Sequence, residues 1–343
     1  MKEKVVYLLG AGFSAPLGLP VMSDFLFKSR DQYFAVPADY SYFAEVFEVI
    51  RKLADVKNYF KADLFNIEEI LSILEMQRHL GRGEAESHDY IKYLCDVVQY
   101  YTPAFSVVNQ VSINWYNNWL GDKKTLFGNF VACLFNLEVK DVRANSPKKR
   151  LFASREKDSQ TMYSVVTLNY DLVLEKLCEQ IRSIMQTDVD FSTGGEVEAG
   201  WLLAPYLAKL HGTVASGKII PPTWNKGLHP EIAEVWKRAY KLFSTATQIR
   251  VVGYSLPETD AYVKYLLKSA VTEARNLKQI DVICLDPKGD VKVRYDEFID
   301  FPNYKFASID VLEYLSHKFP SSQQDHTAKF DFLEKLHHGV SWK

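Results

Sequence analysis

The chain has 343 residues, 47% of them hydrophobic, and 41 basic residues nearly balance 43 acidic ones, which gives a formal net charge of −2. This length accommodates one large domain or two smaller ones with a substantial core. The charge balance gives no global electrostatic reason to bind nucleic acid or an anionic membrane, so we do not expect direct nucleic-acid binding.

Targeting and redox signals point to the cytoplasm. No stretch approaches the roughly 20 apolar residues that a membrane helix needs. The apolar run Val5–Leu9 is shorter than a signal-peptide core, which has about 7 residues or more. The cysteines are widely separated, so we expect neither a zinc site nor a disulfide framework but buried free thiols in a reducing cytoplasm. They are Cys95, Cys133, Cys178 and Cys284.

The first element in chain order is a strand followed by a glycine-rich turn. Val5–Leu9 is apolar throughout, which predicts a strand buried on both faces, as in a parallel sheet. After it, Gly12 would let the backbone approach a ligand, and a following helix would direct its N–H groups at a phosphate. The third glycine, Gly18, comes too late for the dinucleotide fingerprint G-x-G-x-x-G. A turn without a ligand is an equally good interpretation of this stretch alone.

Residues 39–139 show the spacing of a helical bundle. We expect one helix to begin at the N-cap Asn66, with Glu69 three residues later, and to stop at Gly81; a second follows Ser87. The aromatic residues of the bundle are expected to form its core. The apolar stripes are Ile67–Leu74, Ile91–Val98, Val108–Trp119 and Phe127–Leu134.

A polar segment and an alternating region follow the bundle. Residues 141–160 carry a basic cluster and predict a solvated loop between domains, with a phosphate or nucleic-acid contact as the alternative. Beyond them, strand and helix patterns alternate, which predicts an α/β fold with a parallel sheet. Strands are expected at 163–168, 207–210, 219–220, 248–253 and 279–285, and helices at 172–181, 230–243 and 259–274.

These patterns predict a Rossmann-like parallel sheet with helices on both faces, plus an inserted helical subdomain. The Rossmann-like domain would comprise residues 1–35 and 158–305. The inserted helical bundle and linker would span 36–157, and a C-terminal helical tail 306–343. We expect one or two short helices in that tail and a polar loop at 321–327.

Polar residues follow the later strands, at the edge where parallel α/β sheets bind ligands. Asn169 and Asp171 come after the second strand and serve equally well as helix caps. His211 precedes Gly212, where a strand ends, so its imidazole is either structural or at a pocket rim. The ends of the last two strands carry Gly253, Ser255 and Asp286, the last able to accept a hydrogen bond from a ribose hydroxyl.

Four stretches in this order, GAGFSAPLGLP, TLNYD, KLHGT and VGYSLP, resemble the motifs of the sirtuin superfamily. The nearer resemblance is to prokaryotic sirtuin-like NADases, many of them antiviral effectors. It covers residues 4–30 and 162–287, about half of the chain. The resemblance implies NAD+ as substrate. Its implied contacts are Gly10, Ala11, Gly12 and Ser14 at the diphosphate and ribose, Asn169 and Asp171 at the nicotinamide, His211 as catalytic base, Gly253 and Ser255 at the phosphates, and Asp286 at the adenosine.

The chain departs from the deacylating sirtuins in three places. It lacks the two Cys-x-x-Cys pairs of their structural zinc, so we expect no zinc. The stretch Leu19–Phe25 has no clear match for the arginine of the sirtuin Ile-Pro-Asp-Phe-Arg, and Leu168 stands where a glutamine usually precedes the asparagine. These differences count against the binding of an acyl-lysine peptide more than against the binding of NAD+.

The resemblance therefore implies an NAD+ glycohydrolase that cleaves the nicotinamide–ribose bond, an NAD-depleting effector in antiphage defence. His211 would accept a proton, Asn169 would orient water or the ribose, and Asp171 would stabilise the cationic sugar or only cap a helix. The alternatives are an NAD-dependent protein deacylase and a non-catalytic sensor of NAD or ADP-ribose; cyclisation of ADP-ribose also stays open. Because an uncontrolled NADase would kill its host, we expect a homo-oligomer or a sensor or ring-ATPase partner, with residues 39–139 and the tail as contact surfaces.

Overall fold

The computed structural model describes residues 2–108, 118–142, 150–155, 159–193, 204–219, 230–258, 260–316, 327–329 and 333–342. Its centre is a six-stranded sheet in the order β10-β9-β8-β1-β4-β5, in which every pair of neighbours is parallel. The parallel sheet predicted from the sequence is confirmed. Its strands are β1 (Glu3–Leu9), β4 (Thr161–Thr167), β5 (Leu207–Lys209), β8 (Gln248–Val252), β9 (Gln279–Ile283) and β10 (Tyr304–Ala307).

The strand order is that of a doubly wound sheet. The chain runs from β1 outward to β4 and β5, returns to β8 on the other side of β1, and continues outward to β9 and β10. The direction of winding therefore reverses between β1 and β8. In sheets of this kind the crevice outside the carboxyl ends of the strands at the reversal point is where ligands bind. Strand β10 was not predicted from the sequence.

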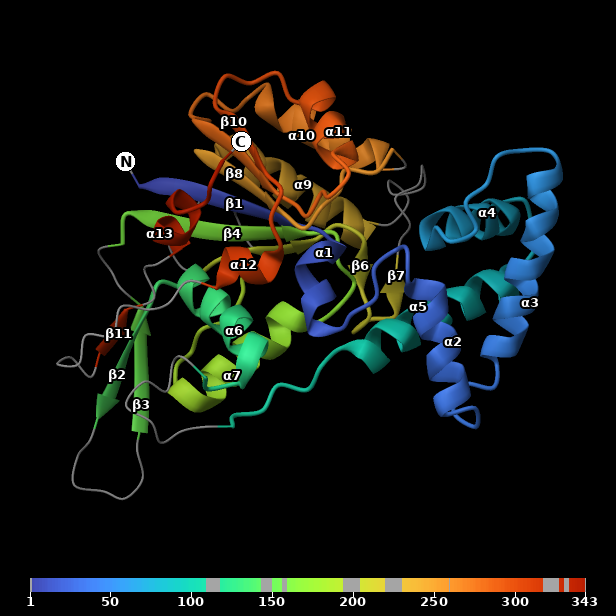
Figure 1. Ribbon diagram of the computed structural model, residues 1–343, viewed down its shortest axis with the longest axis horizontal. Coiled ribbons are helices and arrows are strands. Elements are labelled where there is room, and N and C mark those ends of the chain that lie inside the picture. The colour runs from blue at the N-terminus through green and yellow to red at the C-terminus, as the bar shows by residue number, and fades with distance from the viewer. Residues whose placement is uncertain are drawn as a thin grey trace.

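Alternate residues of β1 contribute to two different cores, which explains why the whole strand is apolar. Val5, Tyr7 and Leu9 belong to one core and Val6 and Leu8 to the other. Helices α9 (Pro230–Thr245), α10 (Ala261–Val271) and α11 (Asp290–Phe298) pack into the second core. The first core receives α1 (Ala11–Ser14), α6 (Asp122–Leu134), α7 (Val173–Met185), α12 (Val311–Leu315) and α13 (Leu333–His338). Helices thus cover both faces of the sheet, as predicted (Figure 1).

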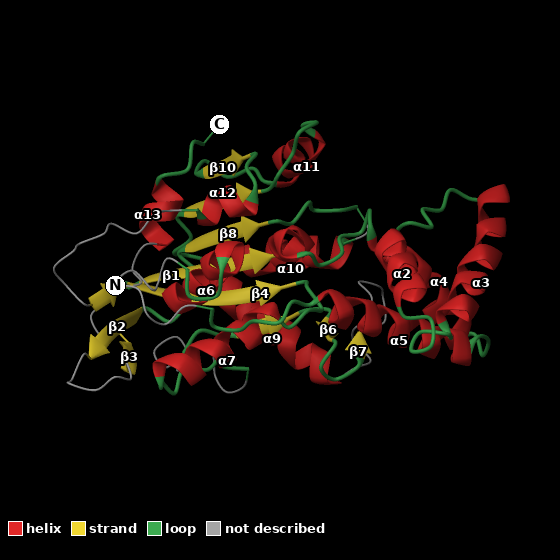
Figure 2. Cartoon of the chain, turned by 60° about the horizontal axis from the view of Figure 1, so that its bottom comes forward, coloured by secondary structure: helices red, strands yellow, loops and turns green. Residues whose placement is uncertain are grey.

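Four helices form a group beyond the carboxyl edge of the sheet, as both views show (Figures 1 and 2). This helical group comprises α2 (Phe25–Ala35), α3 (Phe43–Leu53), α4 (Ile67–His79) and α5 (Glu84–Tyr101). The short 3₁₀ helix η1 (Ala15–Leu17) lies between α1 and α2, and η2 (Ala54–Asn58) lies between α3 and α4. Its buried residues are continuous with the core on one face of the sheet, so the group and the sheet share one apolar interior.

The predicted boundaries of α4 are confirmed. The Oδ1 of Asn66 accepts hydrogen bonds from the backbone N–H groups of Glu68 (3.0 Å) and Glu69 (3.1 Å), and Gly81, with φ +77°, follows the last turn. The carboxylate of Glu69 accepts from the N–H of Asp63 (3.1 Å) and not from that of Asn66, so the capping is one-sided.

Two details of the predicted bundle are wrong. Helix α5 begins at Glu84, and Ser87 lies inside it, buried, where its hydroxyl donates to Glu75. Val108 is 62% exposed and is not a core residue, whereas Trp119 is buried and donates from Nε1 to Asn129 Oδ1 (2.9 Å). The stripe between them falls on residues 109–117, which lie outside the described residues.

The expected solvated loop at 141–160 is replaced in part by a second sheet. Its strands β2 (Leu137–Val142) and β3 (Arg150–Arg155) pair antiparallel, and β11 (Thr327–Lys329) adds to the other edge of β2. Apolar and charged residues alternate over Leu137–Lys140, which is the period of a half-buried strand, and the charges made this stretch resemble a loop. Lys148, Lys149 and Lys157 lie outside the described residues. The tail contains the two expected short helices, α12 and α13, and also β11, which was not predicted.

Within the described part of the chain, no helix combines the length and the apolar character needed to cross a membrane. All four cysteines are free and buried, as predicted. Burial raises the pKa of Cys95, Cys178 and Cys284 to about 11, so these thiols are protonated at neutral pH.

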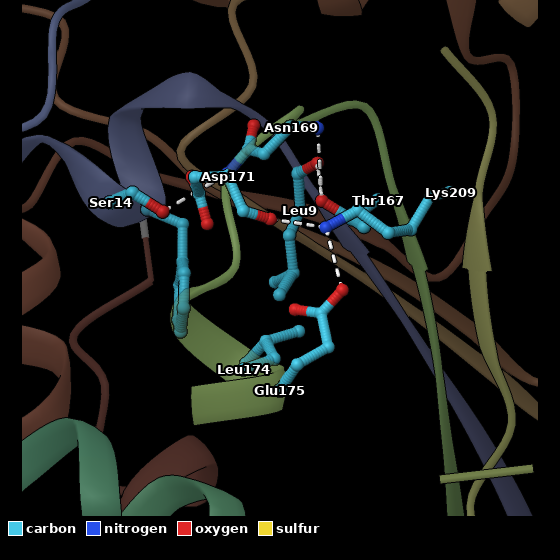
Figure 3. A pocket seen from close by; sticks show the side chains of 9 residues that line it. Leu9, Ser14, Thr167, Asn169, Asp171, Leu174, Glu175 and Lys209 are labelled. Carbon is cyan, nitrogen blue, oxygen red and sulfur yellow. Dashed lines mark hydrogen bonds and ion pairs between the residues drawn. The ribbon is translucent and has the colours of Figure 1, made fainter. Parts of the chain in front are cut away.

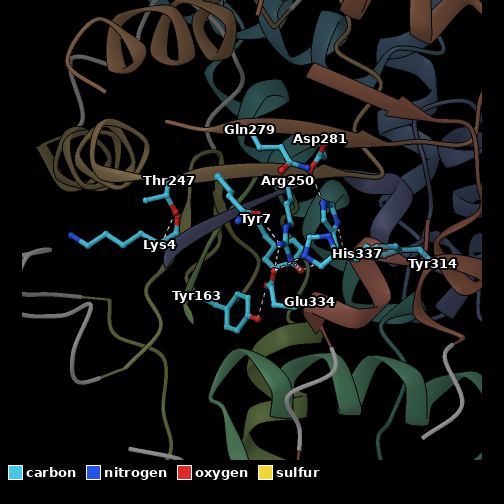
Figure 4. Close-up of polar contacts among 12 residues, drawn as sticks. Lys4, Tyr7, Tyr163, Thr247, Arg250, Gln279, Asp281, Tyr314, Glu334 and His337 are labelled. Carbon is cyan, nitrogen blue, oxygen red and sulfur yellow. Dashed lines mark hydrogen bonds and ion pairs between the residues drawn. The ribbon is translucent and has the colours of Figure 1, made fainter. Parts of the chain in front are cut away.

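A buried polar network fastens α13 to the sheet (Figure 4). The guanidinium of Arg250 on β8 is fully buried and donates to Tyr7 Oη (3.1 Å) and to Glu334 Oε2 (2.6 Å). The second carboxylate oxygen of Glu334 accepts from Tyr163 Oη at 2.8 Å. One turn further along α13, His337 Nε2 lies 2.6 Å from Oδ2 of the buried Asp281 on β9.

We predict that Glu334→Ala lowers the free energy of unfolding by about 3 kcal/mol, because it leaves the buried guanidinium of Arg250 without its carboxylate. Urea denaturation measures the effect. The matched control is Glu313→Ala on α12, an exposed glutamate, which should change the stability by less than about 0.5 kcal/mol. Equal effects of the two variants would show that the buried ion pair does not hold α13.

The same network predicts a pH dependence. Burial lowers the pKa of His337, and the nearby charge of Arg250 acts in the same direction, although the hydrogen bond to Asp281 opposes both. On acidification, the unfolded chain takes up this proton first, so the free energy of unfolding falls as the pH drops below about 6.5, by up to ~1.4 kcal/mol per pH unit.

His337→Asn removes this titration and should flatten the dependence of unfolding free energy on pH below about 6.5. His338→Asn is the control, because the side chain of His338 is 68% exposed on the same helix, and it should keep the wild-type slope. Urea denaturation at several pH values compares the slopes. An unchanged slope in His337→Asn would contradict the prediction.

Candidate functional site

Two glycine-containing turns touch at the carboxyl ends of β1 and β8. The N–H of Gly12 donates to the carbonyl of Gly253 (2.9 Å), and the N–H of Gly10 to that of Val252 (3.1 Å). A Cβ on Gly10 or Gly12 would lie 2.7 or 2.8 Å from the carbonyl oxygen of Gly253, closer than van der Waals contact allows. The glycines therefore allow the two turns to meet. The N–H groups of Gly10 and Gly12, two residues expected at the diphosphate, thus donate to the end of β8 and to the turn after it.

We predict that Gly253→Ala destabilises the fold far more than Gly217→Ala. Both glycines have a left-handed backbone, with φ of +65° and +64°, so both substitutions share a conformational penalty of about 1–2 kcal/mol. Only at Gly253 would the Cβ also lie 2.3 Å from the backbone nitrogen of Phe13, whereas nothing lies within 4 Å at Gly217. Thermal unfolding of both variants measures the difference, and equal losses would contradict the close contact.

Asn169 connects the turn after β4 to the turn after β1 (Figure 3). Its side-chain amide donates to the carbonyl of Gly10 (3.0 Å) and to Ser14 Oγ (3.2 Å), while its own N–H donates to Thr167 Oγ1 (3.1 Å). Residues that the sequence analysis placed in separate motifs thus form one hydrogen-bonded unit. Ala11 is the exposed first residue of α1 beside it.

Asp171 lies at the start of α7, where both interpretations of it can be compared with the structure. Its Oδ1 accepts from the N–H of Val173 (3.0 Å), two residues later, which forms an Asx turn just before the N-cap Leu172. Its backbone carbonyl accepts from Lys209 Nζ, which also pairs with Glu175 Oε1 at 2.8 Å. The cavity beside Ser14, Asn169 and Asp171 has a volume of about 10 Å³. That is the size of a single water site.

His211 lies beside this unit on the next strand end and is enclosed by protein. The N–H of Leu210 donates to the carbonyl of Thr167 (2.9 Å), and that of Val214 to the carbonyl of Tyr170 (3.1 Å), so the backbone on both sides of His211 is tied to the Asn169 turn. The side chain of His211 is only 1% exposed. Its ring centroid lies 6.0 Å from that of Tyr170.

Two carboxylates flank the imidazole. Glu68 Oε1 from α4 lies 3.7 Å from Nδ1 of His211, and Asp260 Oδ1 lies 4.0 Å from Nε2. The other oxygen of Asp260 accepts a hydrogen bond from Tyr254 Oη (2.8 Å). Burial raises the pKa of Tyr254 and of Tyr170 well above the usual tyrosine value, and the charges of Asp260 and Glu68 add to the effect. Both phenols are therefore neutral.

Neither carboxylate was assigned to the site from the sequence. Glu68 stands among the apolar residues of the α4 stripe, between Ile67 and Ile70, and a charged residue on a buried helical face was the available signal. Asp260 stands at the start of the helix predicted at 259–274. It occupies the N-cap position of α10 but makes no capping hydrogen bond with its side chain, which points to His211 and Tyr254 instead.

Two of the residues predicted for the site make their hydrogen bonds elsewhere. Ser255 is exposed, and its carbonyl accepts from Arg294 Nε (3.0 Å). Asp286 uses both carboxylate oxygens at the start of α11, accepting from the N–H groups of Gly289 (3.0 Å) and Lys292 (2.8 Å). The structure brings Gly10, Gly12, Ser14, Asn169 and Gly253 into direct contact and places His211 on the neighbouring strand end. Over the described ranges, no three His, Cys, Asp or Glu side chains gather as a metal site would require.

No family model and no curated protein matches the chain. Solved structures of Sir2 enzymes are similar to it. "Sir2 bound to acetylated peptide" is 12% identical with a TM-score of 0.36, and "Sir2-p53 peptide-NAD+" 14% identical with 0.34; each match covers 92% of this chain and 91% of the other. "Structural Basis for the Mechanism and Regulation of Sir2 Enzymes" is 11% identical with a TM-score of 0.33 and covers 98% and 94%. Identities and TM-scores this low assign no function, which has to follow from the residues of this chain.

Proposed function

We propose that this chain binds NAD+ at the carboxyl edge of its six-stranded sheet and hydrolyses the nicotinamide–ribose bond, giving nicotinamide and ADP-ribose. The observation that supports it best is the meeting of the two glycine turns and Asn169 at the point where the winding of the sheet reverses, with His211 at the end of β5 on the same edge of the sheet. That point is where doubly wound sheets take dinucleotides. The motif resemblance to sirtuin-like NADases supports the same substrate.

The chemistry of the bond explains which groups are needed. Nicotinamide leaves from NAD+ as a neutral molecule, so the leaving group needs no proton, and positive charge develops on the ribose. A base must take a proton from the attacking water or from a ribose hydroxyl. We assign this role to His211. The carboxylate of Asp260, with Oδ1 4.0 Å from Nε2 of the ring, would stabilise the imidazolium that forms.

Asn169 and Asp171 would act on the sugar side. The amide of Asn169 is fixed by Gly10 and Ser14, which gives it one orientation toward water or the ribose. Asp171 is 7% exposed and would stabilise the cationic sugar through its charge while its Oδ1 accepts from the N–H of Val173. Pockets for ligands of this size have volumes of about 300–1,000 Å³. The cavity of about 10 Å³ must therefore widen before NAD+ binds.

We infer that assembly controls this opening. The helical group and the loop before α4 expose large aromatic side chains on one part of the molecule, and such surfaces commonly bind partners. They are Phe27 (57% exposed), Phe34 (73%), Tyr59 (81%), Phe60 (73%) and Phe65 (49%). A homo-oligomer, or a sensor or ring-ATPase partner, would cover them, and regulated NAD depletion in antiphage defence would be the biological role.

The test is to incubate the protein with NAD+ and identify the products by mass spectrometry. His211→Ala should lower turnover by about 10²–10⁴-fold, because a general base contributes that much, and Asn169→Ala should lower it as well. His88→Ala, which removes an exposed histidine of α5, is the control and should leave turnover unchanged.

Other outcomes would replace the proposal. Nicotinamide release that depends on an acetylated peptide would indicate a deacylase, and a cyclic product would indicate cyclisation. Binding of NAD+ without turnover, equal in the wild type and in His211→Ala, would indicate a sensor.

A further inference from the structure

The imidazole of His211 is enclosed by carboxylates from two different parts of the chain. Glu68 lies beside Nδ1 and Asp260 beside Nε2, and the three side chains are 11%, 4% and 1% exposed in the order Glu68, Asp260, His211. A general base needs one nitrogen directed at the reactant and benefits from a group that holds the other. In this arrangement both nitrogens face protein carboxylates, so one carboxylate must withdraw before His211 reaches a substrate.

Asp260 belongs to the rigid edge of the sheet. Its Oδ2 accepts from Tyr254 Oη at 2.8 Å, and Tyr254 follows Gly253 in the turn after β8. The carbonyl of Tyr254 accepts in turn from Tyr295 Oη of α11 at 2.9 Å. Tyr254, Asp260 and Tyr295 are all buried. This chain of hydrogen bonds fixes Asp260 relative to the strand ends that carry His211.

Glu68 belongs to the helical group. It lies in the first turn of α4, whose N–H groups Asn66 caps. Two polar contacts of that turn go to the group or to the segment before it: Tyr90 Oη of α5 donates to the carbonyl of Ile67 (3.2 Å), and the N–H of Ile67 donates to Met22 Sδ (3.2 Å). A movement of the first turn of α4 would therefore carry Glu68 away from His211 and leave Asp260 in place.

We propose that Asp260 is the positioning residue of His211 and that Glu68 is a gate residue, which covers Nδ1 in the closed state described here and uncovers it when the first turn of α4 moves. The division of roles rests on the proposed function, in which His211 is the base. The carboxylate of Glu68 would also repel the anionic diphosphate of a dinucleotide. Its withdrawal would therefore both uncover Nδ1 of His211 and remove this repulsion.

The gate is tested by the accessibility of His211 to diethyl pyrocarbonate, located by peptide mass spectrometry on the full chain. Glu68→Ala should raise the modification of His211 about tenfold, because the covering side chain is gone. Glu69→Ala is the matched control: it removes the neighbouring carboxylate of the same turn, which accepts from Asp63, and should leave His211 protected. The exposed His88 reports equal reagent activity in every sample.

A second variant tests the movement of α4 independently. Asn66→Ala removes the cap of the turn that carries Glu68 and should also raise the modification of His211. Circular dichroism of each variant confirms folding. If His211 stays protected in both Glu68→Ala and Asn66→Ala, the gate is overturned whatever the NAD+ turnover.

Turnover measured on the same samples separates this inference from the proposed function. If Glu68→Ala exposes His211 and raises NAD+ hydrolysis, both stand. If it exposes His211 while no variant consumes NAD+, the gate stands and the proposed reaction fails.

The role of Asp260 is read from kinetics in the Glu68→Ala background. Asp260→Asn should lower kcat at least about tenfold with little change in KM, because it misorients the base without touching the dinucleotide. Tyr254→Phe should lower kcat in the same way but less, since it removes only the anchor of Asp260. A rise in KM with unchanged kcat would assign Asp260 to substrate binding instead and overturn the positioning role.

Discussion

The contact between the turn after β1 and the turn after β8 is the constraint on which the rest of the structure depends. The N–H of Gly12 donates to the carbonyl of Gly253, and a Cβ on either glycine would overlap the backbone of the other turn. The two strands that meet there are the centre of the sheet, where the winding reverses. Two parts of the candidate site are positioned from this junction: Asn169 bonds to Gly10, and Asp260 reaches His211 from the segment that follows Gly253. The contact between these two turns therefore helps to place Asn169 and Asp260 at the candidate site.

The parallel sheet could be predicted from the sequence because its signals are local. A fully apolar run such as Val5–Leu9 requires burial on both faces, and the residues after each strand follow from strand direction alone. Elements of mixed polarity were missed for the opposite reason. Strand β2 alternates Leu137, Val139 and charged residues and needs β3 and β11 to be stable, and helix α11 buries a single residue, Tyr295. Their stability comes from partners distant in the sequence, which no local pattern records.

The sequence likewise predicted some residues of the candidate site and missed others. Residues at strand ends, such as Asn169 and His211, were found because topology places them at one edge. Glu68 was not found, because it reaches His211 from a helix more than a hundred residues earlier in the chain, and only the packing of the helical group against the sheet edge shows that contact. Asp286, expected at a ligand, accepts hydrogen bonds from two N–H groups at the start of α11, since a carboxylate after a strand also satisfies a helix terminus. The spacing of residues along the chain thus predicts at which strand end a side chain lies, but not which residue it contacts.

The buried network around Arg250 has a consequence for biosynthesis. The guanidinium sits in the middle of the sheet, yet its carboxylate, Glu334, is made 84 residues later. Until that segment leaves the ribosome, the nascent chain cannot close this face over a charge that is costly to bury alone. The network around Arg250 is therefore completed only after Glu334 has been synthesised.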